Sequence, residues 1–104
     1  MTTPRPFSMH PSRCPPPDAA TDLLQLPNVG PRAAADLRLL GFNHPADLRG
    51  CDPHQLYLRL CDATGERHDP CVLDVLMSVC HYMDTGEARA WPSFTAERKR
   101  RWTV

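Results

Sequence analysis

From Ala19 onward, the hydrophobic residues recur at intervals of three and four positions, in groups that short turn signals separate. This spacing places apolar side chains on one face of a helix. The group over residues 70–86 is apolar on nearly every face, which predicts a central, buried helix. No segment alternates apolar and polar residues as a half-buried strand does. The pattern therefore predicts an all-α protein, a compact bundle of about five helices.

Proline, aspartate and glycine mark the ends of these helices. Asp52-Pro53 and Asp69-Pro70 each place a capping carboxylate before a proline in the first helical turn. A glycine follows most of the apolar groups, where it can end a helix in the left-handed conformation. The five predicted helices cover about residues 23–26, 31–40, 45–49, 53–65 and 70–86.

The chain divides into three segments. Residues 1–18 are polar and rich in proline, which interrupts helical hydrogen bonding, so we expect a disordered or polyproline-like arm. Residues 19–86 form the predicted helical domain. Residues 87–104 form a basic tail with aromatic side chains. This tail either packs its aromatic residues on the bundle or is a partly ordered charged arm.

The net charge of zero over 104 residues conceals a division between the domain and the tail. Residues 19–86 carry five arginines and nine acidic side chains, a net charge of −4. Residues 87–104 carry five basic and two acidic side chains, a net charge of +3. An acidic domain with a basic tail is a weak electrostatic match to DNA.

The composition also indicates the compartment. No apolar run approaches the length of a membrane span or of a signal peptide, which predicts a cytoplasmic protein without a membrane partner. The five cysteines are odd in number and form no CxxC pair. This argues against a disulfide framework and against a zinc ribbon.

The segment over residues 26–31 has the composition of a tight turn between two helices. Gly30 would let a phosphate approach the main-chain N–H groups of the second helix. Asn28 is one of the few residues besides glycine that tolerate a positive φ. Pro31 has no N–H, but those of Arg32 and Ala33 remain available, and Arg32 adds a positive charge. The segment predicts the hairpin of a helix–hairpin–helix motif.

Residues 24–34 (LQLPNVGPRAA) resemble the helix–hairpin–helix motifs of DNA repair and recombination proteins. The resemblance implies that main-chain N–H groups of the hairpin face DNA phosphates, and that the carbonyls of Leu24, Leu26 and Val29 hold a monovalent cation. Asn28 stands where those motifs have glycine. No other cofactor is expected. The predicted contacts with the DNA backbone are Asn28, Val29, Gly30, Arg32 and Ala33 in the hairpin, and Arg98, Lys99, Arg100 and Arg101 in the tail.

Four blocks extend this resemblance: residues 26–31 (LPNVGP), 47–53 (DLRGCDP), 56–57 (LY) and 69–73 (DPCVL). In this order and spacing they are similar to the small bacterial pathogenicity-locus helix–hairpin–helix family, some of whose members are called mitomycin resistance proteins. The resemblance covers about residues 20–85, and the chain departs from it after Gly86, where a tryptophan-rich ending is expected. It implies a fold and a DNA-related role, but no reaction.

Two functions therefore remain open. The first is binding of the DNA backbone without sequence specificity, in DNA repair or recombination. The second is a protein–protein interaction module that binds no nucleic acid. The chain has no paired-carboxylate, Ser–His or phosphate-loop signature, so we do not expect an enzyme.

Two further hypotheses concern the cysteines, as a nucleophile and as zinc ligands. Cys71 lies in the first turn of a predicted helix, where the helix dipole can lower a thiol pKa and make the sulfur nucleophilic. A cysteine that packs as a small hydrophobe is the more common outcome. A zinc site would need irregularly spaced ligands, which structural zinc sites rarely use. Its candidate ligands are Cys61, His68, Cys71, Cys80 and His81.

Overall fold

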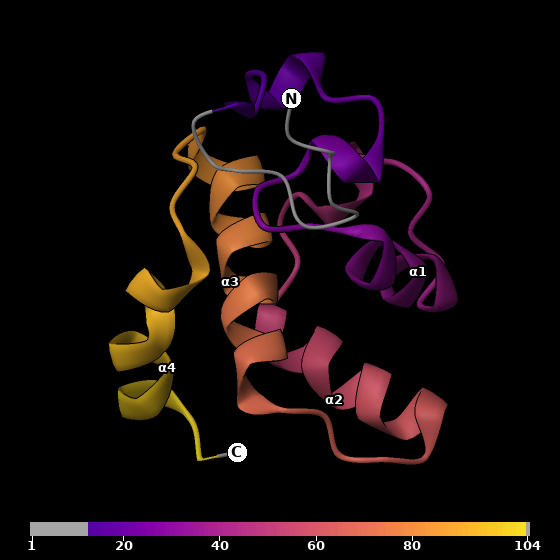
Figure 1. Cartoon of the computed structure of the whole chain (residues 1–104), viewed down its shortest axis with the longest axis vertical. Coiled ribbons are helices and arrows are strands. Elements are labelled where there is room, and N and C mark those ends of the chain that lie inside the picture. Colours follow the sequence, from indigo (N-terminus) through magenta and orange to yellow (C-terminus); the bar gives the residue numbers. More distant parts are fainter. Residues whose placement is uncertain (1–12, 104) are drawn as a thin grey trace, which may run out of the picture.

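The computed structural model describes residues 13–103, which form a helical bundle (Figure 1). The α-helices are α1 (Pro31–Leu39), α2 (Pro53–Thr64), α3 (Pro70–Thr85) and α4 (Thr95–Arg101). The 3₁₀-helices are η2 (Pro17–Ala19), η3 (Leu23–Gln25), η4 (Pro45–Leu48) and η5 (Trp91–Phe94). No β-strand occurs among the described residues, and the predicted all-α class is confirmed.

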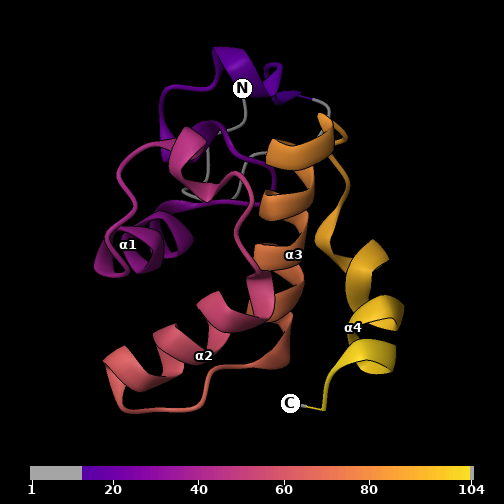
Figure 2. The ribbon, with the colours of Figure 1, turned by 180° about the vertical axis from the view of Figure 1, so that it is seen from behind.

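Helix α3 lies at the centre of the bundle, with the other elements around it (Figures 1 and 2). Both its apolar and its polar side chains are buried along most of its length. The prediction that residues 70–86 form the central helix is therefore confirmed. None of the helices in residues 13–103 is both long enough and apolar enough to cross a membrane. The buried residues of α3 are Leu73, Asp74, Leu76, Met77, Ser78, Val79, Cys80, Tyr82 and Met83.

The predicted ends of α2 and α3 are also confirmed. The Asp52 carboxylate accepts a hydrogen bond from the His54 N–H at 2.9 Å, and the Asp69 carboxylate accepts one from the Cys71 N–H at 2.9 Å. Both helices end at a glycine in the left-handed region, where most side chains would be strained. These boundaries depend on neighbouring residues only, which is why the sequence alone reveals them.

The number of α-helices is four in the described residues, where the sequence predicts about five. The segments predicted as helices over residues 23–26 and 45–49 are the single 3₁₀ turns η3 and η4. Each turn has only three or four residues between its N-cap and the next extended residue, which is Leu26 after η3 and Arg49 after η4. This is too short for a series of α-helical hydrogen bonds to form. The tail, conversely, supplies the additional helix α4.

The tail packs on the bundle. The carboxylate of Asp74, 1 % exposed, accepts hydrogen bonds from the Arg98 Nε–H at 2.6 Å and the Thr95 hydroxyl at 2.8 Å. The Trp102 ring stacks on the His54 ring with centroids 5.0 Å apart. Of the two alternatives for residues 87–104, the structure therefore shows the packed extension up to residue 103.

Of the arm predicted over residues 1–18, residues 1–12 lie outside the described part of the chain. Residues 13–18 contact the bundle. The Tyr82 hydroxyl donates a hydrogen bond to the Pro15 carbonyl, and Arg49 forms an ion pair with Asp18 at 3.1 Å. The buried phenol ring of Tyr82 thus has a partner for its hydroxyl group in this proline-rich segment.

Candidate functional site

The hairpin between η3 and α1 is built from local signals. The Asp22 carboxylate accepts a hydrogen bond from the Leu24 N–H at 2.8 Å, and the Gln25 side chain accepts one from the Asp22 N–H at 3.0 Å. This capping box starts the 3₁₀ turn, and Leu26 leaves it in an extended conformation. Asn28 follows with φ of 64°, so its predicted positive φ is confirmed. Gly30 is then the N-cap of α1.

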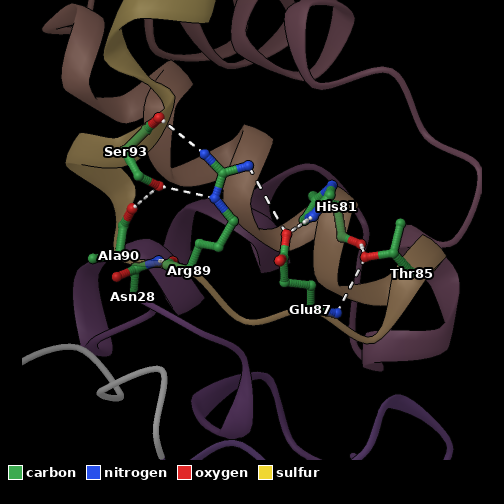
Figure 3. Close-up of polar contacts among 7 residues, drawn as sticks. All are labelled: Asn28, His81, Thr85, Glu87, Arg89, Ala90 and Ser93. Carbon is green, nitrogen blue, oxygen red and sulfur yellow. Dashed lines mark hydrogen bonds and ion pairs between the residues drawn. The ribbon is translucent and has the colours of Figure 1, made fainter.

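The side chain of Asn28 holds this hairpin on the bundle (Figure 3). Its amide nitrogen donates two hydrogen bonds, to the Ser78 hydroxyl at 2.9 Å and to the Arg89 carbonyl at 2.8 Å. Both amide hydrogens are therefore used inside the protein. Only the main chain of Asn28 remains a candidate for contact with a phosphate.

The network around Arg89 keeps its carbonyl in place for Asn28 (Figure 3). The Arg89 guanidinium donates to the hydroxyl and the carbonyl of Ser93, each at 3.1 Å, and lies 4.2 Å from the centroid of the Phe94 ring. The Glu87 carboxylate lies 2.6 Å from the His81 ring nitrogen. Sequence reasoning missed this network, because no local pattern links residues 81–93 to the hairpin.

The predicted hairpin contacts differ in their exposure. Arg32 is exposed, while Gly30 and Ala33 are half-buried. Val29 is 1 % exposed and packs in the core, and its N–H donates to the Leu26 carbonyl at 3.4 Å. Its side chain therefore stabilises the turn, and the residues that can meet a ligand are those from Gly30 to Ala33.

The N-terminus of α1 differs from those of α2 and α3. Gly30 offers no capping side chain, whereas an aspartate caps each of the other two helices. Pro31 occupies the first helical position, where its missing N–H is of no consequence. The next N–H groups, those of Arg32 and Ala33, belong to the helical turn that usually takes an anion or a cap as its acceptor.

The three carbonyls predicted to hold a monovalent cation belong to η3 and the hairpin. The Leu26 carbonyl already accepts the Val29 N–H, so it would offer a cation its second lone pair. The cation stays a prediction.

The predicted contacts in the tail do not form one basic patch. Arg98 is buried against Asp74, so it has no exposed charge for a phosphate. Arg101 forms an ion pair with Glu97 at 3.1 Å and lies 4.1 Å from the Trp102 ring centroid. Lys99 and Arg100 are exposed. Since α4 and α1 lie on opposite sides of α3 in Figures 1 and 2, the tail does not extend the surface around Arg32.

The five candidate zinc ligands do not come together. Within residues 13–103, no group of three or more His, Cys, Asp or Glu side chains is placed to hold a metal ion. His68, before α3, lies 2.8 Å from the Thr64 hydroxyl at the end of α2, whereas His81 lies near the end of α3, against Glu87.

The environment of Cys71 opposes its use as a nucleophile. Burial raises the pKa of the Cys71 thiol, and the Asp69 carboxylate that caps the same helix raises it further. The cap places a negative charge beside the sulfur, which opposes the effect that the N-terminal position on α3 has on the thiol pKa.

We expect Cys71 to react with iodoacetamide at neutral pH more slowly than the cysteine of an unstructured peptide. Replacing Asp69 with alanine should accelerate the reaction, because it removes the neighbouring carboxylate. Mass spectrometry of the native protein, quantified at each cysteine, measures both rates. A Cys71 that reacts faster than the peptide would restore the nucleophile hypothesis.

Comparison with known proteins identifies the family. Residues 17–100 match the family model described as "Pathogenicity locus". The mitomycin resistance protein McrB of Streptomyces lavendulae is 42 % identical over 80 residues, which cover 77 % of this chain and 76 % of that protein. None of the solved structures matches the chain. The resemblance deduced from the sequence blocks is confirmed, and the chain belongs to the pathogenicity-locus family.

Proposed function

We propose that the segment from Gly30 to Ala33 binds the phosphate backbone of DNA without sequence specificity, as the hairpin of a helix–hairpin–helix motif. The supporting observation is the N-terminus of α1, which has no capping side chain and carries the exposed Arg32. A phosphate can take the place of the missing cap and pair with the guanidinium. No catalytic step is part of this proposal, which places the protein in DNA repair or recombination.

The charges near the hairpin favour weak binding. Two acidic side chains line the same hollow of the surface as Arg32: Asp36, one turn after Arg32, and Asp69 at the start of α3. Their carboxylates repel the phosphates that Arg32 attracts. The affinity should therefore be low at physiological salt and should rise steeply as the salt concentration falls.

We expect the Arg32→Ala variant to bind a fluorescein-labelled duplex about five- to tenfold more weakly than the wild type at low salt. The slope of log affinity against log salt should decrease by about one, because one phosphate contact is lost. Fluorescence anisotropy at several salt concentrations measures both quantities, for double- and single-stranded DNA.

Arg38→Ala is the matched control, since Arg38 is an exposed arginine in the last turn of the same helix. Its replacement changes the net charge equally but leaves the hairpin intact. Equal losses in the two variants would indicate general charge attraction and would contradict the hairpin as the contact. Absence of binding by the wild type at low salt would contradict DNA binding itself.

A protein-interaction module is the second candidate. It is favoured by three large apolar side chains that remain exposed among the described residues: Leu24 at 40 %, Leu39 on α1 at 56 % and Leu58 on α2 at 44 %. Helices α1 and α2, which carry Leu39 and Leu58, pack against each other. Under this alternative the partner binds the bundle and DNA plays no part.

The name of the Streptomyces lavendulae relative assigns that protein to mitomycin resistance. We propose that this chain also acts in mitomycin resistance. Binding to the DNA backbone would be its contribution to that resistance.

A further inference from the structure

A groove of about 470 Å³ lies between α1 and the N-terminal half of α3. Its walls are mostly aliphatic, and the hairpin forms one end of it through residues 29–33. Val72 and Val75 are only half-buried, so their side chains are accessible from the groove. Four of the other apolar side chains that line it are buried: Val29, Leu37, Leu76 and Val79.

The polar side chains of the groove carry an excess of negative charge. Asp36 and Asp69 supply two carboxylates, and Arg32 supplies one guanidinium. The remaining titratable groups that line it are His68 and Cys71. The hydrogen bond from the Cys71 N–H lowers the pKa of Asp69, which keeps that carboxylate ionised at neutral pH. The raised pKa of Cys71 keeps its thiol uncharged.

The size of the groove decides between a macromolecule and a small ligand. Its volume of about 470 Å³ is that of a pocket rather than of an extended protein interface, which buries about 800 Å² per partner. Pockets for small organic molecules measure about 300–1,000 Å³ and combine apolar walls with a few polar groups. The groove meets both of these conditions.

We propose that this groove is a binding site for a small organic cation, in which an apolar ring system contacts Val72 and Val75 and a protonated amine faces Asp36 and Asp69. The aliphatic walls bind the ring through burial of apolar surface. The two carboxylates select a positively charged group over a negatively charged one. This site does not depend on DNA binding, although Arg32 borders both.

Tryptamine and indole-3-acetate are suitable probes, because they share an indole ring and carry opposite charges. In a titration followed by ¹H–¹⁵N NMR, tryptamine should shift the amide signals of residues that line the groove: Gly30, Arg32, Ala33, Val72 and Val75. It should bind at least about threefold more tightly than indole-3-acetate, since each surface charge pair contributes modestly.

Two variants test the two parts of the site. Asp36→Asn should reduce the preference for tryptamine, because Asp36 supplies one of the carboxylates. Val75→Phe should fill the groove and abolish binding of both probes, with its thermal melt recorded to verify folding. Leu58→Phe is the matched control, since Leu58 lies outside the groove and is exposed on α2.

The proposal is overturned if neither probe shifts the groove signals, or if the two probes bind equally well. It is also overturned if Asp36→Asn leaves the preference unchanged. These outcomes are independent of the DNA titration, which uses Arg32→Ala and a different ligand.

Discussion

The Asp74→Ala variant is expected to lose about 3–5 kcal/mol of its free energy of unfolding. Asp74 lies in the middle of α3 and is 1 % exposed, and its carboxylate accepts hydrogen bonds from Arg98 and Thr95. Removing the carboxylate leaves the Arg98 guanidinium buried without its counter-charge. A buried, unpaired charge is far more costly than an exposed one. A loss of this size is a large fraction of the stability of a domain of about 100 residues.

The loss of stability in Asp74→Ala should appear first as undocking of the tail from the bundle. The Asp74–Arg98 pair joins α4 to α3, and the Trp102–His54 stack joins the end of the tail to α2. Urea denaturation followed by circular dichroism measures the global stability. Tryptophan fluorescence reports on the undocking of the tail, because both tryptophans, Trp91 and Trp102, lie in it.

Glu97→Ala is the control for this prediction. Glu97 pairs with Arg101 at 3.1 Å, but both side chains are substantially exposed, at 41 % and 52 %. Breaking an exposed pair should cost less than about 1 kcal/mol. Replacing both Asp74 and Arg98 with apolar residues of similar volume should recover much of the lost stability, since no buried charge is then left unpaired. An Asp74→Ala variant as stable as Glu97→Ala would contradict the role of the buried pair.

The second large effect is expected for Asn28→Gly, which removes the side chain of Asn28 and keeps a residue that tolerates a positive φ. We expect a loss of about 2 kcal/mol in the free energy of unfolding, even though glycine adopts a φ of 64° without strain. The variant loses the hydrogen bonds to Ser78 and to the Arg89 carbonyl. The Ser78 hydroxyl still donates to the Val75 carbonyl at 2.6 Å, but the Arg89 carbonyl loses its donor.

Asn28→Ala should lose about 1 kcal/mol more than Asn28→Gly, because alanine also has to adopt the left-handed conformation. Asn43→Gly provides the control, since Asn43 is exposed in the loop after α1 and should be affected only weakly. Thermal and urea denaturation measure all three variants. If Asn28→Gly were as stable as the wild type, the side chain of Asn28 would not hold the hairpin on α3.

The candidate site was therefore only partly predictable. The positive φ of Asn28 and the position of Gly30 before α1 follow from the intrinsic preferences of these residues, so the sequence indicates them. The sequence predicts that Arg98 is an exposed basic residue of the tail, because its neighbours are Lys99 and Arg100. The structure places it against Asp74, 24 positions earlier in the chain. A run of like charges does not show which of its members faces the core.

The sequence by itself determined the all-α class, the central position of residues 70–86, and the start and end of α2 and α3. These features depend on apolar spacing and on caps within a few residues. Only the tertiary structure decided the role of Asn28, whose partners lie 50 and 61 positions away, and the burial of Arg98. It also decided that the groove lies between α1 and α3 and that the basic tail lies away from Arg32. Such contacts join residues that are distant in the chain, and they form only when the helices pack.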